Sequence, residues 1–495
     1  MILGRSRAES SSIDMSKLST NFIYNITYQI LVIILPLITA PYVSRVLGVD
    51  GVGTYSYIYS IAYYFCLCGM LGVSNHGNRS VAMLKDDRDK LSSTFWAIYK
   101  IQFATTMFSL VCYLIFVTFF FSGDKRVAYI DTFYLVSYVL DINWLYFGLE
   151  KFKLTVTRNM VFKVLSVVCT FVFVRTADDL WKYTLILSFG TMLSQVYLWI
   201  HLFRYVTYKK NCWKEISVQI KPILILFIPV IAYSIYKVMD KIMLGSMSSV
   251  QQVGLYENAD KIIGIPVGII TAFGTVMMPR ISALTSKNEV KQIENYNKLS
   301  FKYFSLLSIG MTFGLIGISN ILPDVYFGHE FIDCAPLIAG LSFTLIFMTW
   351  ANIIRTQYLI PNKIDRPYVV STICGAIVNL LFNFFLIPRF QARGALVGTV
   401  LAEFMVFFVQ AIYVRKEFFV LQYLKPVIPF IFNGIVMSVI VFFLGKYGGS
   451  SVIVLLLQIA VGVVVYLGLS IIYLGIIKDS LITTIVTRIK ALCIK

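Results

Sequence analysis

Apolar segments of about 20 residues recur along this whole chain, and they limit its fold more than any other feature. A helix that rises 1.5 Å per residue needs about that many apolar residues to cross the hydrocarbon core of a bilayer. Of the 495 residues, 58% are hydrophobic and only 14% are charged. The sequence therefore predicts an all-α polytopic membrane protein with about 14 transmembrane helices.

Positively charged residues are distributed unequally between the loops on the two sides of the membrane. Counted alternately, one set of loops carries about 30 Lys and Arg residues and the other set about 8. Because cytoplasmic loops are the ones rich in Lys and Arg, we expect the first set, and both termini, to face the cytoplasm. The net charge of +18 is spread thinly over those inner loops. This spread favours contact with anionic membrane lipids and argues against nucleic acid as a partner.

A weak internal repeat suggests two lobes. The segment GVGTYSYIYSI at 51–61 resembles QVGLYENADKI at 252–262, and without a gap Arg79 falls on Arg280, 201 positions later. Both copies read as a hairpin with an Arg at its inner mouth. Six predicted helices separate the two starts, and an even offset gives parallel repeats with a cleft between two six-helix lobes.

The predicted organisation has four parts. They are a cytoplasmic N-terminal segment at 1–20, an N-lobe of six helices at 21–204, a C-lobe of six helices at 205–414, and two further helices with a cytoplasmic tail at 415–495. A polar stretch at 282–298 has the Lys and Glu spacing of an amphipathic helix on the inner surface.

Ionisable residues inside the predicted spans are the candidate site, because each costs roughly 2.5–3.5 kcal/mol in hydrocarbon. The seventh and eighth helices each carry three such residues at i, i+3 and i+4, hence on one face. Three are basic and three acidic, so this set is neutral. A salt-bridge network that gates the cleft and a substrate-binding site both remain open. The residues are Lys237, Asp240, Lys241, Glu257, Asp260 and Lys261.

Other intramembrane charges are less balanced. Asp141 and Glu403 are candidates for a coupling proton or cation, with a structural partnership to a nearby Lys or Arg as the plainer alternative. Lys100, Arg355 and Arg45 lie near the ends of predicted helices. These three either snorkel to the membrane surface or line a cavity for an anion.

No enzymatic pattern emerges from the sequence. The three His residues are far apart, no P-loop is present, and the eight Cys residues form no CxxC pair. We therefore expect neither a metal nor another cofactor, and no catalytic residue.

Several segments resemble a known family. DINWLYFGLEKFK at 141–153, DKIMLG at 240–245, VGLYENADKI at 253–262 and MMPRIS at 277–282 are similar to signatures of the Wzx-type polysaccharide flippases. This family belongs to the multidrug/oligosaccharidyl-lipid/polysaccharide exporter superfamily. The similarity extends over essentially the whole chain, including its length.

The resemblance implies a function and a location. The implied substrate is an undecaprenyl-pyrophosphate-linked oligosaccharide repeat unit, moved from the inner to the outer leaflet for surface polysaccharide such as O-antigen or capsule. The implied location is the bacterial plasma (inner) membrane, and the polysaccharide polymerase machinery is a further implied partner. A cationic cleft would suit the diphosphate. The polyprenyl tail would stay in lipid beside the helices outside the repeat.

Two other classes remain open at this point. A multidrug or cation antiporter shares the two-lobed fold, but it favours an acidic, apolar cavity. A polysaccharide polymerase or ligase needs a larger outer loop than the chain offers.

Overall fold

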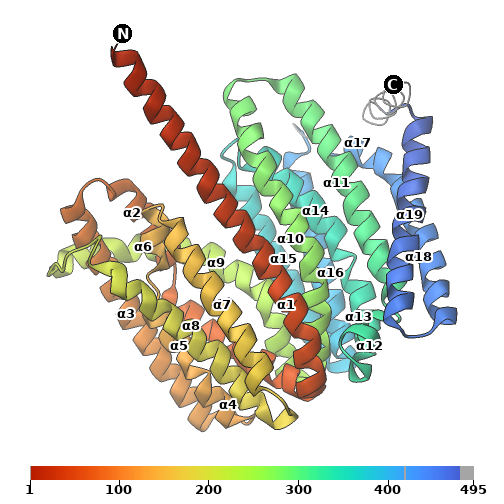
Figure 1. Ribbon diagram of the computed structural model, residues 1–495, viewed down its shortest axis with the longest axis horizontal. Helices are drawn as coiled ribbons and strands as arrows, with labels where there is room; N and C mark the ends of the chain where they lie inside the picture. Colours follow the sequence, from red (N-terminus) through yellow and green to blue (C-terminus); the bar gives the residue numbers. More distant parts are fainter. Residues whose placement is uncertain (1, 417–419, 480–495) are drawn as a thin grey trace. The chain divides into compact units, whose positions relative to one another are not determined.

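The computed structural model describes residues 2–416 and 420–479, and every regular element in these residues is helical (Figure 1). Two compact units divide the chain: unit 1 runs to Ser234 and unit 2 starts at Ile235. The all-α fold expected from the apolar segments is confirmed.

Unit 1 is built from the first eight α-helices and the beginning of the ninth. They are α1 (Ile2–Met70), α2 (Val73–Leu84), α3 (Arg88–Phe119), α4 (Lys125–Ile130), α5 (Thr132–Val139), α6 (Asn143–Gly148), α7 (Phe152–Phe173), α8 (Leu180–Leu202) and the first part of α9 (Trp213–Met247).

Unit 2 contains the end of α9 and the remaining helices. They are α10 (Val250–Ser286), α11 (Val290–Ile318), α12 (Leu322–Tyr326), α13 (Cys334–Leu341), α14 (Thr344–Ile354), α15 (Asp365–Phe390), α16 (Ala392–Val414), α17 (Val420–Leu424), α18 (Ile428–Gly448) and α19 (Val452–Ile476). A π-helical turn, Arg355–Leu359, continues α14.

Eleven helices in the described residues are long and apolar enough to cross a membrane, or twelve if a bent pair in α1 and α2 counts as one span. The protein is therefore a multi-pass membrane protein. The total of fourteen stays a prediction. The backbone of Gly48 leaves the helical region inside α1, with φ 66°, between the spans expected at 21–46 and 54–77. The expected helix at 129–149 is divided into parts of α4, α5 and α6.

The two hairpins of the suspected repeat differ in local structure. In unit 1 the helix stops at Met70, and Leu71 has a positive φ of 49° before α2 begins. The aligned part of unit 2 continues unbroken through α10 to Ser286. Superposition of the two lobes therefore stays a prediction. The prediction of one amphipathic surface helix at 282–298 is wrong, because these residues form the end of α10 and the start of α11.

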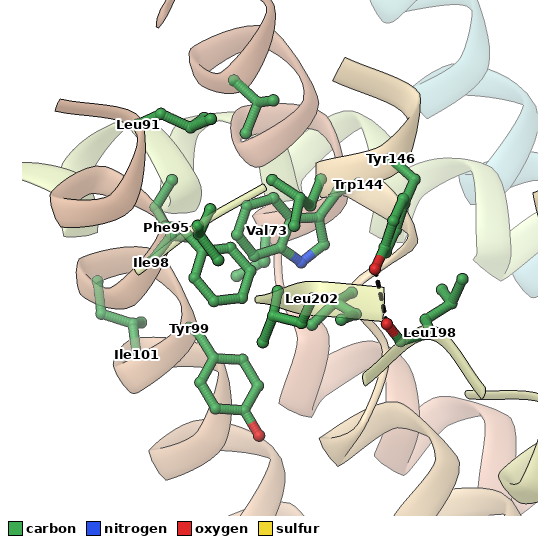
Figure 2. Packing of buried hydrophobic residues seen from close by; sticks show 14 of the residues in the cluster. Val73, Leu91, Phe95, Ile98, Tyr99, Ile101, Trp144, Tyr146, Leu198 and Leu202 are labelled. Carbon is green, nitrogen blue, oxygen red and sulfur yellow. Dashed lines mark hydrogen bonds between the residues drawn. The ribbon is translucent and has the colours of Figure 1, made fainter. Parts of the chain in front are cut away.

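The core of unit 1 lies where α2, α3, α6 and α8 meet (Figure 2). Phe95 and Trp144 are almost completely buried, with their rings 5.2 Å apart. The hydroxyl of Tyr146 donates to the carbonyl of Leu198 at 2.6 Å, as Figure 2 shows. A Cβ on Gly77 would lie 2.5 Å from the Trp144 ring, so only glycine lets α2 approach α6 this closely. This packing fixes the short helix that follows Asp141.

Candidate functional site

The buried carboxylate of Asp240 in α9 is surrounded by four neutral donors. Its side chain is 3% exposed. The hydroxyls of Tyr256 and Thr399 donate to it at 2.8 and 2.7 Å, and the Asn379 amide donates at 2.9 Å. The Asn383 amide is the fourth donor. Four donors from α10, α15 and α16 replace much of the water that a carboxylate loses on burial.

This arrangement corrects one expectation about the six charges of the seventh and eighth predicted helices. Asp240 pairs with no Lys or Arg in the described part of the chain, although it precedes Lys241 directly. Its side chain points instead toward Asn379 and Asn383, which lie four residues apart and hence on one face of α15. Sequence spacing placed Asp240 on the correct helix but assigned it the wrong partners.

Four of the remaining charges do form the expected ion-pair network. The Lys241 ammonium lies 2.6 Å from Glu257 and 3.4 Å from Asp260. Lys261 lies 3.4 Å from the other oxygen of Glu257. Two lysines and two carboxylates leave no net charge. The side chains of Lys241 and Glu257 are only 15% and 17% exposed, so solvent screens this pair weakly.

The last lysine of the set pairs across unit 2. Lys237 on α9 lies 3.1 Å from a carboxylate oxygen of Glu403 on α16. Glu403 is 4% exposed and therefore needs such a partner. The structure thus brings together two residues that the sequence singled out separately. This pair matches the structural partnership considered for Glu403.

Arg355 is the candidate cation of unit 2 whose side-chain contacts are with neutral groups. It begins the π-helical turn and donates to the side-chain amide oxygen of Asn352 at 2.7 Å. Its guanidinium group lies 5.5 Å from the centre of the Tyr368 ring. Two residues further along, Gln357 is 1% exposed and neither atom of its amide has a partner in the described structure. π-Helical turns are frequent at functional sites, and an unsatisfied buried amide requires an explanation.

Two of the unit 1 candidates, Asp141 and Lys100, form hydrogen bonds with asparagines. Asp141 accepts from the backbone and side-chain nitrogens of Asn143 at 2.8 and 2.6 Å, and so supports the first turn of α6. Lys100 donates to the side-chain amide oxygen of Asn211 at 3.2 Å. Arg45 and Arg79 have exposed side chains. Their proposed roles stay predictions.

A buried cation of unit 1 was not expected from the sequence. Arg158 on α7 is 4% exposed and donates to oxygens of Asn143, Gln195 and Ser194 at 2.9 to 3.1 Å. In the sequence it lies five residues after Lys153 and five before Lys163, and such a basic stretch is typical of an inner loop. At the inner mouth expected in unit 2, the exposed Arg280 stacks on Tyr296, 4.7 Å from the ring centre.

A cavity of about 420 Å³ lies in unit 2 between α11, α18 and α19. Glycines at 310, 314 and 462 make room for it, and its walls are mostly aliphatic. Two polar side chains line it, and both donate to backbone carbonyls. The Gln458 amide nitrogen donates to Val441 and the Tyr466 hydroxyl to Leu306, both at 2.7 Å, while the Gln458 amide oxygen has no partner in the described structure. The cavity therefore suits a hydrocarbon chain better than a polar ligand.

No group of three or more His, Cys, Asp or Glu side chains in the described residues is placed to hold a metal ion. The Asp240 group is the nearest approach to a cation site. It offers a carboxylate and two hydroxyl oxygens, which are ligand types for hard cations, but both asparagines turn their amide nitrogens toward the carboxylate. The Asn383 amide oxygen is buried without a partner.

Comparison with known proteins supports the resemblance. The family model described as polysaccharide biosynthesis protein matches residues 18–285, more than half of the chain. A protein assigned as an O-antigen transporter in Shigella dysenteriae is 24% identical over 75% of this chain and 93% of its own length. Another with the same assignment, from Escherichia coli strain K12, is 24% identical over 81% of this chain and 97% of its own.

Among solved structures, the lipid II flippase MurJ in an inward closed conformation has a similar fold. The TM-score is 0.73 at 15% identity, over 93% of this chain and 100% of MurJ. The match therefore supports the fold, while the family rests on the sequence match. The chain belongs to the polysaccharide biosynthesis protein family, and its expected membership of the Wzx-type polysaccharide flippases is confirmed.

Proposed function

We propose that this protein moves undecaprenyl-pyrophosphate-linked oligosaccharide repeat units from the inner to the outer leaflet of the bacterial plasma membrane. It acts as a transporter and not as an enzyme. The structural observation that carries the proposal is the aliphatic cavity between α11, α18 and α19. A lipid-linked glycan carries a long hydrocarbon tail, and such a tail needs an apolar surface on the transporter.

The tail is assigned to this cavity because its walls are mostly aliphatic and the two polar donors that line it already donate to backbone carbonyls. Two of the three helices that form it, α18 and α19, lie outside the predicted twelve-helix repeat. Burying apolar surface there contributes roughly 25 cal/mol per Å². A hydrophilic glycan cannot make use of such walls, so the headgroup must bind elsewhere in the protein.

Arg355 is the best candidate in unit 2 for the diphosphate. Its contacts with Asn352 and Tyr368 leave its positive charge without a neutralising carboxylate in the contacts described above. Guanidinium groups suit phosphate because they present several donors in one plane. Lys100 in unit 1 also donates to a neutral amide, and we propose it and Arg45 as substrate-binding cations of that unit.

The paired lysines suit a different role. Lys237, Lys241 and Lys261 lie beside carboxylates, so an incoming diphosphate would have to displace Glu403, Glu257 or Asp260. We propose that these pairs form a gate that separates when substrate binds, with Arg79 and Arg280 at the inner mouths. Asp240 and Asp141 are proposed as coupling groups.

The orientation follows from the charge of the loops. Both termini and the loop near Lys209 face the cytoplasm, while the segment near His329 is external. The His329 side chain is 87% exposed. Single cysteines placed at 209 and 329 should therefore react differently with an impermeant thiol reagent applied to intact cells. Equal labelling of both positions would contradict this topology.

Export of polymer tests the diphosphate site. Arg355→Ala should lower surface polymer and cause the lipid-linked repeat unit to accumulate on the inner leaflet, at normal protein abundance. Loss of one charge-assisted contact of about 1.5–3 kcal/mol corresponds to roughly 10- to 150-fold weaker binding. Lys287→Ala is the matched control, because Lys287 is exposed just beyond α10. If the two variants behave alike, Arg355 is not the diphosphate site.

A further inference from the structure

Asp131 is a second fully buried carboxyl group, and nothing in the proposed transport mechanism uses it. It lies in unit 1, between α4 and α5, and its exposed fraction is 0%. Its position before α5 would suit a helix cap, but its side chain accepts no hydrogen bond from the backbone of α5. Helix capping therefore does not explain this acid.

A single side-chain donor reaches Asp131 in the described structure. The Ser188 hydroxyl on α8 donates to the Oδ1 oxygen of Asp131. The second oxygen, Oδ2, is buried and has no partner among the described residues. The hydroxyl of Thr132, the next residue, is also buried without a partner there. The break between α4 and α5 thus holds two unsatisfied oxygens.

Among the described residues, the helices packed around Asp131 supply no ion-pair partner. The titratable groups that interact with it electrostatically are the Tyr59 phenol and Cys66 thiol of α1 and the Tyr113 phenol of α3. These groups are ordinarily neutral at physiological pH. From α8 it meets Ser188, and none of the ion pairs among the described residues includes Asp131.

We propose that Asp131 is a proton-binding site and holds its proton in this conformation. An ionised carboxylate buried with one hydroxyl partner and no cation lacks both of the interactions that stabilise a buried charge. A bound proton on Oδ2 removes the charge and leaves the Ser188 hydrogen bond in place. The site depends on α4, α5 and α8 staying packed, so their separation would hydrate Asp131 and release the proton.

Infrared difference spectroscopy on the purified full-length protein tests this directly. At neutral pH the wild type should show the C=O stretch of a protonated carboxylic acid, and this band should respond only slowly to transfer into D₂O. Asp131→Asn should remove the band, while Ser188→Ala should shift it, because a hydrogen bond to the group is lost. Asp89→Asn is the control and should leave it unchanged, since the Asp89 side chain is 82% exposed.

Thermal stability gives a second readout. An acid that is protonated when folded and ionised when exposed binds more protons in the folded state, so stability falls as the pH rises. Asparagine has the shape of the protonated acid, so Asp131→Asn should fold normally and weaken this pH dependence. The proposal is overturned if the carboxylic-acid band is absent from the wild type, or survives unchanged in Asp131→Asn. A matching stability profile for the variant and the wild type would also overturn it.

Discussion

Asp240 in unit 2 and Asp131 in unit 1 are both buried carboxyl groups, yet their surroundings differ. Asp240 receives hydrogen bonds from Tyr256, Thr399 and two asparagines. Asp131 receives one, from Ser188. Four donors can stabilise a negative charge in a place that water does not reach, whereas one donor cannot. The number of donors, and not burial alone, therefore decides whether a buried acid can hold a negative charge.

The same contrast extends to the rest of the two units. In unit 2, Asp240 has neutral donors, while Lys241, Lys261 and Lys237 are each opposed by a carboxylate. In unit 1 the buried Arg158 is surrounded by neutral oxygens of Asn143, Gln195 and Ser194. We therefore expect substitutions of charge to have different effects in the two units.

The largest effect is expected at Asp240. Asp240→Ala would leave four donors facing each other without their common acceptor, and should lower the free energy of unfolding by about 3–5 kcal/mol. Asp131→Asn should change it far less at neutral pH. Thermal unfolding in detergent compares the two variants. Similar losses for both would remove the distinction drawn between the two acids.

A smaller effect is expected at the ion-pair network. Glu257→Lys places a third ammonium group beside those of Lys241 and Lys261 in a partly buried site, and should cost about 2–3 kcal/mol. Adding Lys241→Glu reverses the pair and should recover part of that loss, since Asp260 also lies near position 241. A double-mutant cycle on thermal unfolding gives the interaction energy. If the double variant is no more stable than the single one, the contact between the two side chains does not stabilise the protein.

The smallest effect, and one of opposite sign, is expected at Gln357. Its amide is buried without partners, so Gln357→Leu should raise the free energy of unfolding by about 1–2 kcal/mol. Gln102 in unit 1 is the matched control. Its amide donates to the carbonyls of Tyr138 and Asp141 and accepts from Trp144. Gln102→Leu should therefore destabilise the protein, and a loss of stability in both variants would contradict the prediction for Gln357.

Local patterns were read correctly from the sequence. Hydropathy predicted the all-α membrane fold, and helical spacing placed Lys241, Glu257 and Asp260 within reach, because a short turn joins their helices. The pairing of Lys237 with Glu403 could not be predicted from helical spacing, since 166 positions separate the two residues. The donors to Asp240 from α15 and α16 were missed for the same reason.

Breaks within spans were also missed. The divisions between α4, α5 and α6 interrupt the mostly apolar segment 129–149, which was expected to be one helix. Hydropathy averages over such breaks and cannot locate them. Asp131 lies at one of these breaks, so it received no attention as a buried acid. Burial of Arg158 depends on packing against α6 and α8, which charge counting cannot reveal.

The claim that the protein translocates a lipid-linked glycan can be tested in proteoliposomes that contain only the purified protein. Undecaprenyl-pyrophosphate-linked oligosaccharide is placed in the lipid, and its access to an impermeant glycan-modifying enzyme is followed over time. Our account predicts that the protein speeds exposure of the glycan on the opposite leaflet, that Arg355→Ala slows it, and that Lys287→Ala does not. A protein that leaves the glycan in place but moves a cationic drug across the same membrane would contradict the account and favour a multidrug antiporter.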